Sequence, residues 1–306
     1  MIDHFFESHQ NNKEVISLSK SLTLASLKKQ NRKSSVSSFA KQGEVLTRVK
    51  FDEYFRFENF EKAKVGKKLH VLGSGAFGDV YLVKHKLDGK FFAVKKMDKE
   101  KILNSGASLD IVRREIDIHS RLIHENIVRL YSSHEDEISF FLLLEYANAG
   151  TLFGTIKKNK SMDESKAFKY FIQTASALHF LHDNNLIHRD IKPENLLVDA
   201  NDNIKLCDFG WCIELEIGNR KTFCGTIEYM APEIIKEMPY DGSIDVWSLG
   251  VLLYELLHGY SPFRAQNLDE ESEATEVFKN IIKNQFRIDR KDISDYSKDL
   301  IKSINY

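Results

Sequence analysis

The most informative stretch for the fold and chemistry of this chain is His188-Arg189-Asp190-Ile191-Lys192-Pro193-Glu194-Asn195, followed after a short gap by Asp208-Phe209-Gly210. Asp190 can accept the proton of a hydroxyl group, and Lys192 can neutralise charge on a moving phosphate. Asn195 and Asp208 carry hard oxygen atoms, which are the ligands that Mg²⁺ prefers in proteins. A β-prone run and a turn separate the two motifs, so we expect them on neighbouring loops.

A glycine-rich stretch upstream reads Leu72-Gly73-Ser74-Gly75-Ala76-Phe77-Gly78-Asp79-Val80. Its G-x-G-x-x-G string also occurs in dinucleotide-binding folds, where it opens a helix, and a plain glycine hairpin is a further alternative. Residues 79–83 instead resemble the second strand of a hairpin. Glycines let the backbone approach phosphate groups because no Cβ stands in the way. The stretch therefore predicts a flap over the phosphates of a nucleotide.

A lysine and a glutamate are further candidates for binding the phosphates of a nucleotide. Lys95 ends a strand-like run, and it can bridge the α- and β-phosphates if a carboxylate holds its ammonium group in place. Glu115, on the helix expected over 109–122, is the candidate partner, while Lys96 and Asp117 are expected to face the other way. Taken alone, the pair could be an ordinary surface ion pair of little energetic weight. With the other motifs it indicates phosphoryl transfer from ATP to a hydroxyl group.

Composition narrows the function classes. The formal net charge of the 306 residues is −1, which argues against a general nucleic-acid-binding or membrane-coating role. Cys207, Cys212 and Cys224 lack metal-site spacing and are expected to be reduced thiols inside the cell. The N-terminus has no signal-peptide pattern, and the longest apolar stretch, residues 246–257, is interrupted and too short to span a bilayer. A cytoplasmic or nuclear protein is expected.

The residue pattern divides the chain into a tail and two lobes. Residues 1–55 are rich in Ser, Lys and Asn and are predicted to be a disordered basic tail. Residues 56–147 indicate a small β-rich lobe with one main helix, and residues 148–306 a larger helical lobe, so the expected fold class is α+β. Ser161-Met162-Asp163-Glu164 predicts a capping box for the next helix. Residues 245–257 are apolar on nearly every side and predict a buried central helix.

With these motifs, residues 58–306 resemble the eukaryotic protein kinase family. The resemblance also rests on Ala231-Pro232-Glu233 and on Asp245-Val246-Trp247-Ser248-Leu249-Gly250. Six motifs in the family's order are far more specific than any one of them. The resemblance implies the bilobal kinase fold, ATP as phosphoryl donor and Mg²⁺ as metal. Lys192, two residues beyond Asp190, matches the serine/threonine-specific branch.

Within that family the chain looks most like an Aurora-type kinase. Trp211, directly after the Asp-Phe-Gly motif, is the sharpest indicator. Three further stretches are similar to Aurora sequences: Phe57-Glu58-Asn59-Phe60-Glu61, Arg113-Arg114-Glu115 and Arg220-Lys221-Thr222-Phe223-Cys224-Gly225-Thr226. Cys-Gly-Thr also occurs in other kinase groups, and Cys212 stands where Aurora kinases usually carry serine. The resemblance implies an activating peptide on the smaller lobe and association with the spindle or centrosome.

The resemblance also implies roles for single residues. Asp190, Lys192 and Asn195 would be catalytic, with Asn195 and Asp208 as the metal ligands. Leu144 would be the gatekeeper behind the adenine pocket. Nucleotide contacts are expected from Leu72, Gly73, Ser74, Gly75, Ala76, Phe77, Gly78, Val80, Ala93, Lys95, Glu115, Leu144, the hinge Glu145-Tyr146-Ala147, and Asp208.

Regulation is implied by three positions. Thr222 would be the activating phosphosite, whose phosphate Arg189 would bind and so order the loop. Because Arg220 precedes Thr222 by two residues, we predict that the enzyme phosphorylates this threonine itself. Trp211 is expected in the surface that an activating peptide grips, or alternatively in plain packing against the helix of Glu115.

Substrate preference is implied by Glu194 and Glu255, which match positions that hold an arginine two residues before the target hydroxyl. Thr226 is assigned to the substrate site as well. Protein substrates with basic residues before Ser or Thr are therefore the expected partners. Two alternatives stay open: a non-catalytic or weakly active truncated kinase that binds nucleotide or partners, and another group of basic-directed kinases.

The last residues raise an expectation about the second lobe. In related kinases the helix that reaches Tyr306 continues and later supplies an arginine that pairs with the residue matching Glu233. The second lobe is therefore expected to lack its last helices. Glu233 would find another cation, be reached by solvent, or leave a less stable product, because a buried carboxylate without its partner costs about 3–5 kcal/mol.

Overall fold

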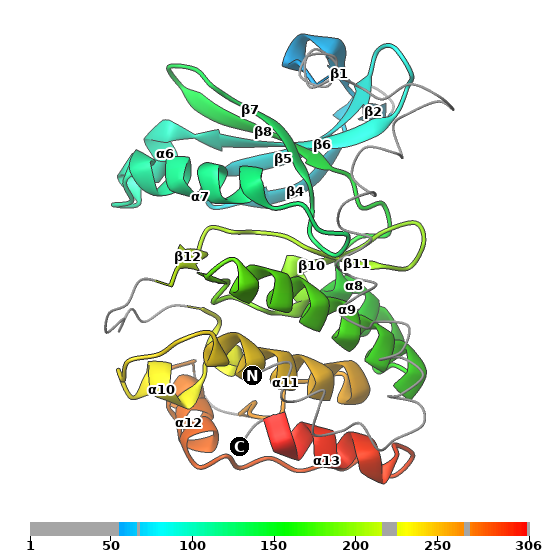
Figure 1. Cartoon of the computed structure of the whole chain (residues 1–306), viewed down its shortest axis with the longest axis vertical. Helices are drawn as coiled ribbons and strands as arrows, with labels where there is room; N and C mark the ends of the chain where they lie inside the picture. The colour runs from blue at the N-terminus through cyan, green and yellow to red at the C-terminus, as the bar shows by residue number, and fades with distance from the viewer. Residues whose placement is uncertain (1–54, 66–67, 216–224, 266–269, 305–306) are drawn as a thin grey trace. The chain divides into compact units, whose positions relative to one another are not determined.

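The structure is a computed structural model, and it describes residues 55–65, 68–215, 225–265 and 270–304. The predicted tail, apart from Phe55, lies outside the described residues, as do Thr222 and Cys224. The chain separates into two compact units (Figure 1). The first holds the described residues up to His124 together with Val128–Tyr146, and the second holds Glu125–Ile127 and the residues from Ala147 onward.

The boundary differs from the predicted lobes at Ala147, which belongs to the second unit, and in one earlier segment. Glu125–Ile127 belong to the second unit. Asn126 explains why: its carbonyl oxygen accepts a hydrogen bond from the Leu206 N–H at 2.7 Å, and its side-chain Nδ2 donates to the Ile204 carbonyl at 3.0 Å. Contacts to residues nearly 80 positions away leave no local pattern in the sequence.

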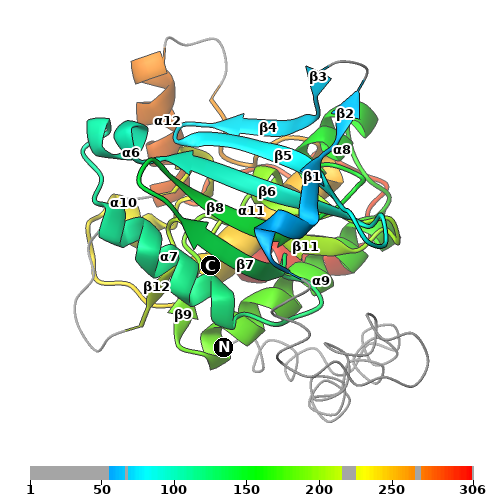
Figure 2. The same ribbon diagram turned by 90° about the horizontal axis from the view of Figure 1, so that it is seen from above.

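An antiparallel sheet forms the first unit, with strand order β1-β5-β6-β8-β7 and β4 paired to β5 (Figure 2). Its strands are β1 (Phe60–Lys62), β4 (Val71–Gly75), β5 (Gly78–His85), β6 (Phe91–Asp98), β7 (Leu130–Glu135) and β8 (Ser139–Glu145), and β2 (Lys64–Val65) pairs with β3 (Lys68–Leu69) beside it. The unit also contains η1 (Phe57–Asn59), α6 (Lys99–Asn104) and α7 (Leu109–Arg121).

Alternation along the strands places apolar side chains on both faces of the sheet. One face carries a cluster around Phe92, Val94 and Leu143, and the other a cluster around Met97, Phe140 and Leu142. Val112 of α7 joins the second cluster, so the predicted helix covers that face. Ser108 caps α7, since its hydroxyl accepts from the Asp110 N–H.

The second unit is mainly helical (Figure 1). Its helices are α8 (Leu152–Asn159), α9 (Glu164–Asp183), α10 (Pro232–Ile235), α11 (Ser243–His258), α12 (Glu270–Ile282) and α13 (Asp295–Ile304), with the short turns η2 (Pro193–Asn195) and η3 (Ile227–Tyr229). Two small antiparallel pairs complete it: β10 (Leu196–Val198) with β11 (Ile204–Leu206), and β12 (Ile213–Glu214) with β9 (Leu186–Ile187).

Helix α11 is the predicted central helix, and it is confirmed as buried on nearly every side. It packs against α9 and α13. The predicted α+β class is also confirmed. Within the part of the chain that the structure describes, the helices lack the combined length and apolar character required to cross a bilayer.

The predicted capping box is wrong. Asp163, not Ser161, caps α9, because its side chain accepts from the Lys166 N–H at 2.9 Å. Glu164 turns away from its own helix. Its carboxylate accepts hydrogen bonds from the Ser294 and Ser297 hydroxyls at the start of α13. A carboxylate at a helix N-terminus is stabilised by the helix dipole, so the tertiary contact prevails over the local one.

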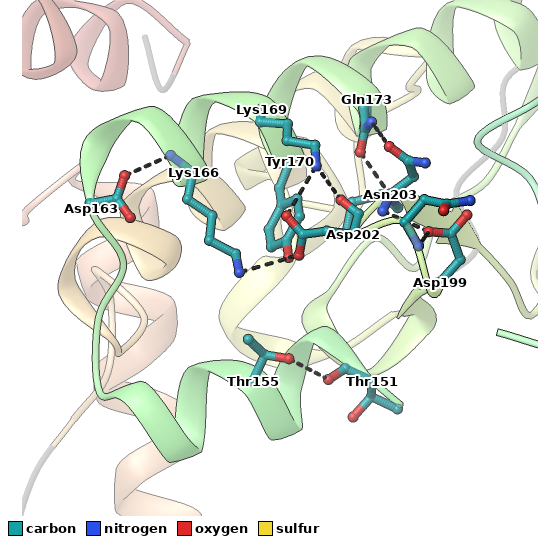
Figure 3. Close-up of polar contacts among 12 residues, drawn as sticks. Thr151, Thr155, Asp163, Lys166, Lys169, Tyr170, Gln173, Asp199, Asp202 and Asn203 are labelled. Atoms are coloured by element: carbon teal, nitrogen blue, oxygen red, sulfur yellow. Dashed lines mark hydrogen bonds and ion pairs between the residues drawn. The ribbon is translucent and has the colours of Figure 1, made fainter. Parts of the chain in front are cut away.

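Asp202 connects the β10–β11 hairpin to α9 through ion pairs and a hydrogen bond (Figure 3). Its carboxylate pairs with Lys169 at 3.0 Å and Lys166 at 3.2 Å and accepts from the Tyr170 hydroxyl at 2.5 Å. Burial alone would raise the pKa of Asp202, but the hydrogen bonds from Tyr170, Lys169 and Lys166 outweigh it and lower the pKa to about 2. The hairpin is therefore held at its turn, between the two motifs that it separates.

Replacing this carboxylate is expected to destabilise the second unit. Because the Asp202 side chain is 46% exposed and solvent screens its ion pairs, Asp202→Asn should lower the free energy of unfolding by only about 1 kcal/mol at pH 7. The folded-state pKa is lowered, so this stability is present above the unfolded pKa of about 4 and is lost as pH falls toward 2. Urea titrations at pH 7 and pH 3 measure the difference.

The matched control is Asp299→Asn, since Asp299 is 75% exposed and lies 3.9 Å from its partner Lys302. Its effect should stay within about 0.5 kcal/mol at both pH values. A difference between the parent and Asp202→Asn that is as large at pH 3 as at pH 7 would contradict the assignment.

Candidate active site

The glycine-rich stretch is a hairpin. Gly73 pairs with Val80 and Gly75 with Gly78, so Ala76 and Phe77 form the turn. The glycine pattern in the sequence predicts a turn over 73–78, and the structure shortens that turn to these two residues. Gly78 opens strand β5, which excludes the helix that a dinucleotide-binding turn requires.

Two glycines of the hairpin have different reasons to be glycine. A Cβ on Gly78 would lie 1.9 Å from the Lys96 carbonyl oxygen, so only glycine fits beside β6. A Cβ on Gly73 would meet nothing within 4 Å. The backbone there faces open space, which suits the close approach of a phosphate group. Phe77 packs its ring against the cluster around Met97 and Phe140.

Four of the residues predicted to contact nucleotide share one face of the sheet. In the strand register Val80 lies opposite Lys95, and Ala93 lies opposite Leu144. Opposite residues, and residues two apart on one strand, project from the same face. The predicted gatekeeper Leu144 thus stands on the same face as the lysine.

The predicted Lys95–Glu115 ion pair is present. Lys95 Nζ donates to Glu115 Oε1 at 3.4 Å, and the Glu115 side chain is only 9% exposed. Lys96 instead lies over the Phe141 ring, and Asp117 pairs with Arg121, as their expected orientations require. The pair joins β6 to α7 and holds the ammonium group at the face that carries Ala93 and Leu144.

The predicted hinge begins at the end of β8. The Glu145 N–H donates to the Arg129 carbonyl at 2.9 Å, and its carboxylate accepts from the Arg129 N–H at 3.1 Å. The division between the two units falls between Tyr146 and Ala147. The remaining predicted contacts, Leu72, Ser74 and Ala76, lie in the exposed hairpin.

Three polar side chains surround the carboxylate of Asp190. Asn195 Nδ2 donates to Asp190 Oδ2 at 2.8 Å, and Lys192 Nζ lies 2.9 Å from the same oxygen. Thr226 Oγ1 donates to Asp190 Oδ1 at 3.2 Å and accepts from Lys192 Nζ at 2.7 Å. Asp190 is 7% exposed. A substrate hydroxyl that replaced Thr226 at Oδ1 could pass its proton to the carboxylate.

The two predicted metal ligands are neighbours. The Cys207 N–H donates to the Asn195 carbonyl at 2.9 Å, which continues the β10–β11 ladder and sets Asp208 beside Asn195. Asn195 directs its Nδ2 to Asp190, so its Oδ1 is left for a cation, and the Asp208 side chain is exposed. Mg²⁺ usually takes one or two protein oxygens and completes its shell with phosphate and water. These residues fit such an ion.

His188 and Phe209 are buried beneath the loops that carry Asp190 and Asp208, and their rings pack against each other. His188 is fully buried, and its ring meets Phe209 edge-on with centroids 5.3 Å apart. Burial lowers the pKa of His188, so a neutral, packed ring is expected. Asp245 of α11 accepts from the His188 N–H at 2.9 Å and the Arg189 N–H at 2.8 Å. Sequence reasoning gave Asp245 no role, although its motif was noted.

The two described residues that are predicted to be regulatory are in contact. Arg189 Nε donates to the Trp211 carbonyl oxygen at 2.7 Å. Trp211 is 47% exposed. Tyr240 also contacts Arg189, and sequence reasoning missed it.

The predicted arginine-binding residues belong to an acidic surface. Glu194 is exposed, and Glu255 accepts a hydrogen bond from the Tyr229 hydroxyl. Burial raises the pKa of Glu255 to about 7, and the nearby carboxylates of Glu228 and Glu194 add to the rise although the Tyr229 hydrogen bond opposes it. Burial likewise raises the pKa of Glu228. Sequence reasoning missed Glu228; its place two residues after Thr226 was the available signal.

Glu233 is half-buried, and its carboxylate accepts a hydrogen bond from the Ser243 hydroxyl at 3.4 Å. Its pairing with an arginine from a later helix stays a prediction.

Comparison with known proteins shows which protein family this chain belongs to. The family model described as protein kinase domain matches residues 67–305. An Aurora kinase of Yarrowia lipolytica is 42% identical over 234 residues, which are 76% of this chain and 61% of that protein. An Aurora kinase of Candida glabrata is 40% identical over 85% of this chain and 69% of its own length. The serine/threonine-protein kinase Aurora-2 of Arabidopsis thaliana is 40% identical over 76% of this chain and 80% of its own length.

Proposed function

Because the chain belongs to the protein kinase family and, within it, to the Aurora-type serine/threonine kinases, we propose that it transfers the γ-phosphoryl group of ATP to Ser and Thr hydroxyls in basic sequences. The chain spans about three-fifths of the Yarrowia lipolytica relative, so activity, substrates and partners of the whole protein are part of this proposal. The observation that carries it is at the base of the β10–β11 hairpin, where Asn195 donates to Asp190 and pairs through its carbonyl with Cys207, the residue before Asp208.

The chain's residues would divide the work as follows. Asp190 accepts the proton of the attacking hydroxyl, and Lys192, held 2.9 Å from it, balances charge on the moving phosphate. Asn195 and Asp208 would hold Mg²⁺, which neutralises the phosphate oxygens when bound. Lys95, fixed by Glu115, would orient the α- and β-phosphates beneath the glycine hairpin. Positioning and charge stabilisation then supply most of the rate.

Substrate choice would follow from the acidic surface. The carboxylates of Glu228 and Glu194 raise the pKa of Glu255 beyond what burial does. Those of Glu273 and Glu194 likewise raise the pKa of Glu228, although Arg264 opposes the rise. An arginine guanidinium, always charged and able to bind carboxylates through two N–H groups, relieves that repulsion. We propose that it comes from the residue two positions before the phosphorylated hydroxyl.

The preference for this arginine should weaken in acid. The pKa of Glu255 is raised to about 7, so the side chain is charged at pH 8 and mostly protonated at pH 6. For two peptides that differ only in Arg or Ala two residues before the serine, the ratio of kcat/KM should fall about three- to tenfold from pH 8 to pH 6. Steady-state assays at both pH values measure it.

In this ratio of kcat/KM values, the effects of all ionisable groups that act equally on both peptides cancel. Glu255→Gln is the control, and its ratio should be lower at pH 8 and change less with pH than that of the parent. A parent ratio that is the same at both pH values would show that Glu255 does not bind the arginine.

Regulation is proposed at Thr222 and Trp211. Phosphorylated Thr222 would carry nearly two negative charges, and Arg189 of the catalytic motif would bind them. Trp211 would lie in the surface gripped by an activating peptide. We further propose that residues 1–55 are a tail outside the kinase domain and that the protein acts at the spindle or centrosome, as the Aurora relationship suggests.

A further inference from the structure

A carboxylate at the end of strand β7 joins the sheet of the first unit to both of its α-helices. Arg113 of α7 binds Glu135 through two nitrogens: Nε donates to Oε2 at 3.2 Å, and Nη2 donates to Oε1 at 2.8 Å. Lys99, the first residue of α6, places its Nζ 2.7 Å from the same Oε1. The hydrogen bonds from Arg113 and Lys99 lower the pKa of Glu135 to about 2, so its carboxylate is charged at neutral pH. We call these three residues the α7 clamp.

Further contacts hold both cations of the clamp. Asp110, one turn earlier on α7, accepts from Arg113 Nη1 at 2.7 Å, and Lys99 Nζ donates to the Asp136 carbonyl at 2.6 Å. Lys99 Nζ and the Arg113 guanidinium lie 5.0 Å and 5.9 Å from the centroid of the buried Phe140 ring. The Arg113 side chain is 48% exposed, and a single ion pair of such exposure contributes little. A bidentate arginine within a network of charges is the exception.

Three kinds of contact hold α7 on the sheet. Val112 and Ile116 pack on the apolar cluster of that face, but apolar packing is not directional and allows a helix to rotate or slide. Glu115 lies 3.4 Å from Lys95, whereas charge-assisted hydrogen bonds of this kind usually measure about 2.7–2.9 Å. The fork of Arg113, two residues before Glu115, fixes direction as well as distance. The clamp therefore restrains the rotation of α7 that would separate Glu115 from Lys95.

We propose that Glu135 and Arg113 are positioning residues: their forked ion pair fixes α7 so that Glu115 holds the ammonium group of Lys95 at the α- and β-phosphates of the nucleotide. The inference rests on the proposed phosphate-binding role of Lys95. It assigns a role in nucleotide binding to an ion pair that lies outside the residues predicted to contact the nucleotide.

The test compares the binding of ADP and adenosine, since only ADP carries the phosphates that Lys95 would bind. Calorimetric titration of the full chain, with Mg²⁺ present, gives both dissociation constants, and their ratio measures the advantage of ADP. Glu135→Gln keeps the size of the side chain and removes its charge. The advantage of ADP should shrink about fivefold, the order expected when a network coupled to a second site is broken. The dissociation constant of adenosine should change less than about twofold.

Glu137→Gln is the matched control. It makes the same chemical change two residues later, in the exposed turn between β7 and β8. Its advantage of ADP should stay within about twofold of the parent, as for a surface substitution. Melting curves show that each variant is folded at the temperature of the titration. An equal advantage of ADP in folded Glu135→Gln and the parent would overturn the proposal.

Arg113→Lys tests the fork itself. Lysine keeps the positive charge but loses the planar pair of donors, so the advantage of ADP should again shrink, by about threefold or more. A full advantage of ADP in this variant would show that a single positive charge suffices, and the forked ion pair would then not be the positioning device.

A double-mutant cycle tests whether the clamp acts through Lys95. In the Lys95→Met background, Glu135→Gln should cause no further loss of ADP affinity, because the group that it positions is gone. Losses that add in the double variant would mean that Glu135 acts by another route, and the proposal would be wrong.

Peptide phosphorylation separates the two levels of inference. If the parent transfers no phosphate but favours ADP, and Glu135→Gln loses that advantage, the clamp stands and the proposed kinase activity fails. If the parent transfers phosphate and Glu135→Gln keeps the full advantage of ADP, only the clamp is wrong. A parent that binds ADP no better than adenosine would remove the role of Lys95 and the clamp with it.

Discussion

Asp208→Ala is expected to lower the phosphorylation rate of a basic serine peptide by at least about a thousandfold, because it removes a proposed metal ligand, and the ion that it would hold contributes several kcal/mol of charge stabilisation. The side chain is exposed and lies beside Asn195 at the end of the β10–β11 ladder, so its loss should not disturb the core. Transfer of labelled phosphate from ATP, with Mg²⁺ present, measures the rate.

Asp299→Ala is the control for this variant. Asp299 is also an exposed aspartate of the second unit, and its rate should stay within about twofold of the parent. Equal phosphate incorporation by the parent and Asp208→Ala would remove the assignment of Asp208. A folded parent protein that binds Mg²⁺ and ATP yet transfers no phosphate would favour the non-catalytic binding module.

Asp190→Asn should lower kcat by about a hundred- to ten-thousandfold, since an amide cannot take up the proton of the attacking hydroxyl. The new side chain has nearly the same shape, and the Asn195 Nδ2 bond to the backbone carbonyl of residue 190, at 2.8 Å, persists. The KM for ATP should therefore change little, because this carboxylate is not assigned to nucleotide binding. Steady-state kinetics with varied ATP separate the two parameters.

Asp190→Asn and Asp208→Ala should differ in how their nucleotide binding depends on Mg²⁺. Loss of a metal ligand should weaken the Mg²⁺ dependence of nucleotide binding, whereas loss of the base should leave it unchanged. Calorimetric titration of both variants with ATP, with and without Mg²⁺, measures this difference. A kcat for Asp190→Asn within tenfold of the parent would exclude the proposed base.

The catalytic elements were predictable because their signals are local. The strand and turn between Asn195 and Asp208 determine the ladder that makes these residues neighbours. Strand and helix alternation likewise distinguishes Lys95 and Glu115 from Lys96 and Asp117. The central helix α11 was predictable because its apolar residues cover nearly every side.

The errors arose where distant residues decide the structure. Glu164 lies 130 positions from Ser294, and this contact replaces the capping box that its neighbours predicted. The Arg189–Tyr240 hydrogen bond spans 51 positions and has no periodic signature. The glycine hairpin was placed correctly, but its strands extend into the predicted turn, because glycines that pair across a ladder look like loop residues in the sequence.

The acidic surface could be predicted only in part from the sequence. Glu194 and Glu255 were predicted one by one from the family resemblance, but their mutual repulsion with Glu228 depends on how η3 and α11 bring them together. A pKa near neutrality follows from burial and proximity, neither of which can be assigned from residue identity alone.

The most direct measurement is mass spectrometry of a basic serine peptide after incubation with the folded parent protein, ATP and Mg²⁺. We predict one added phosphoryl group on the serine hydroxyl, formed together with an equal amount of ADP and absent when Asp208→Ala replaces the parent. An unmodified peptide, with the parent fully folded and the serine preceded by arginine at the proposed position, would contradict the assignment of this chain as a working kinase.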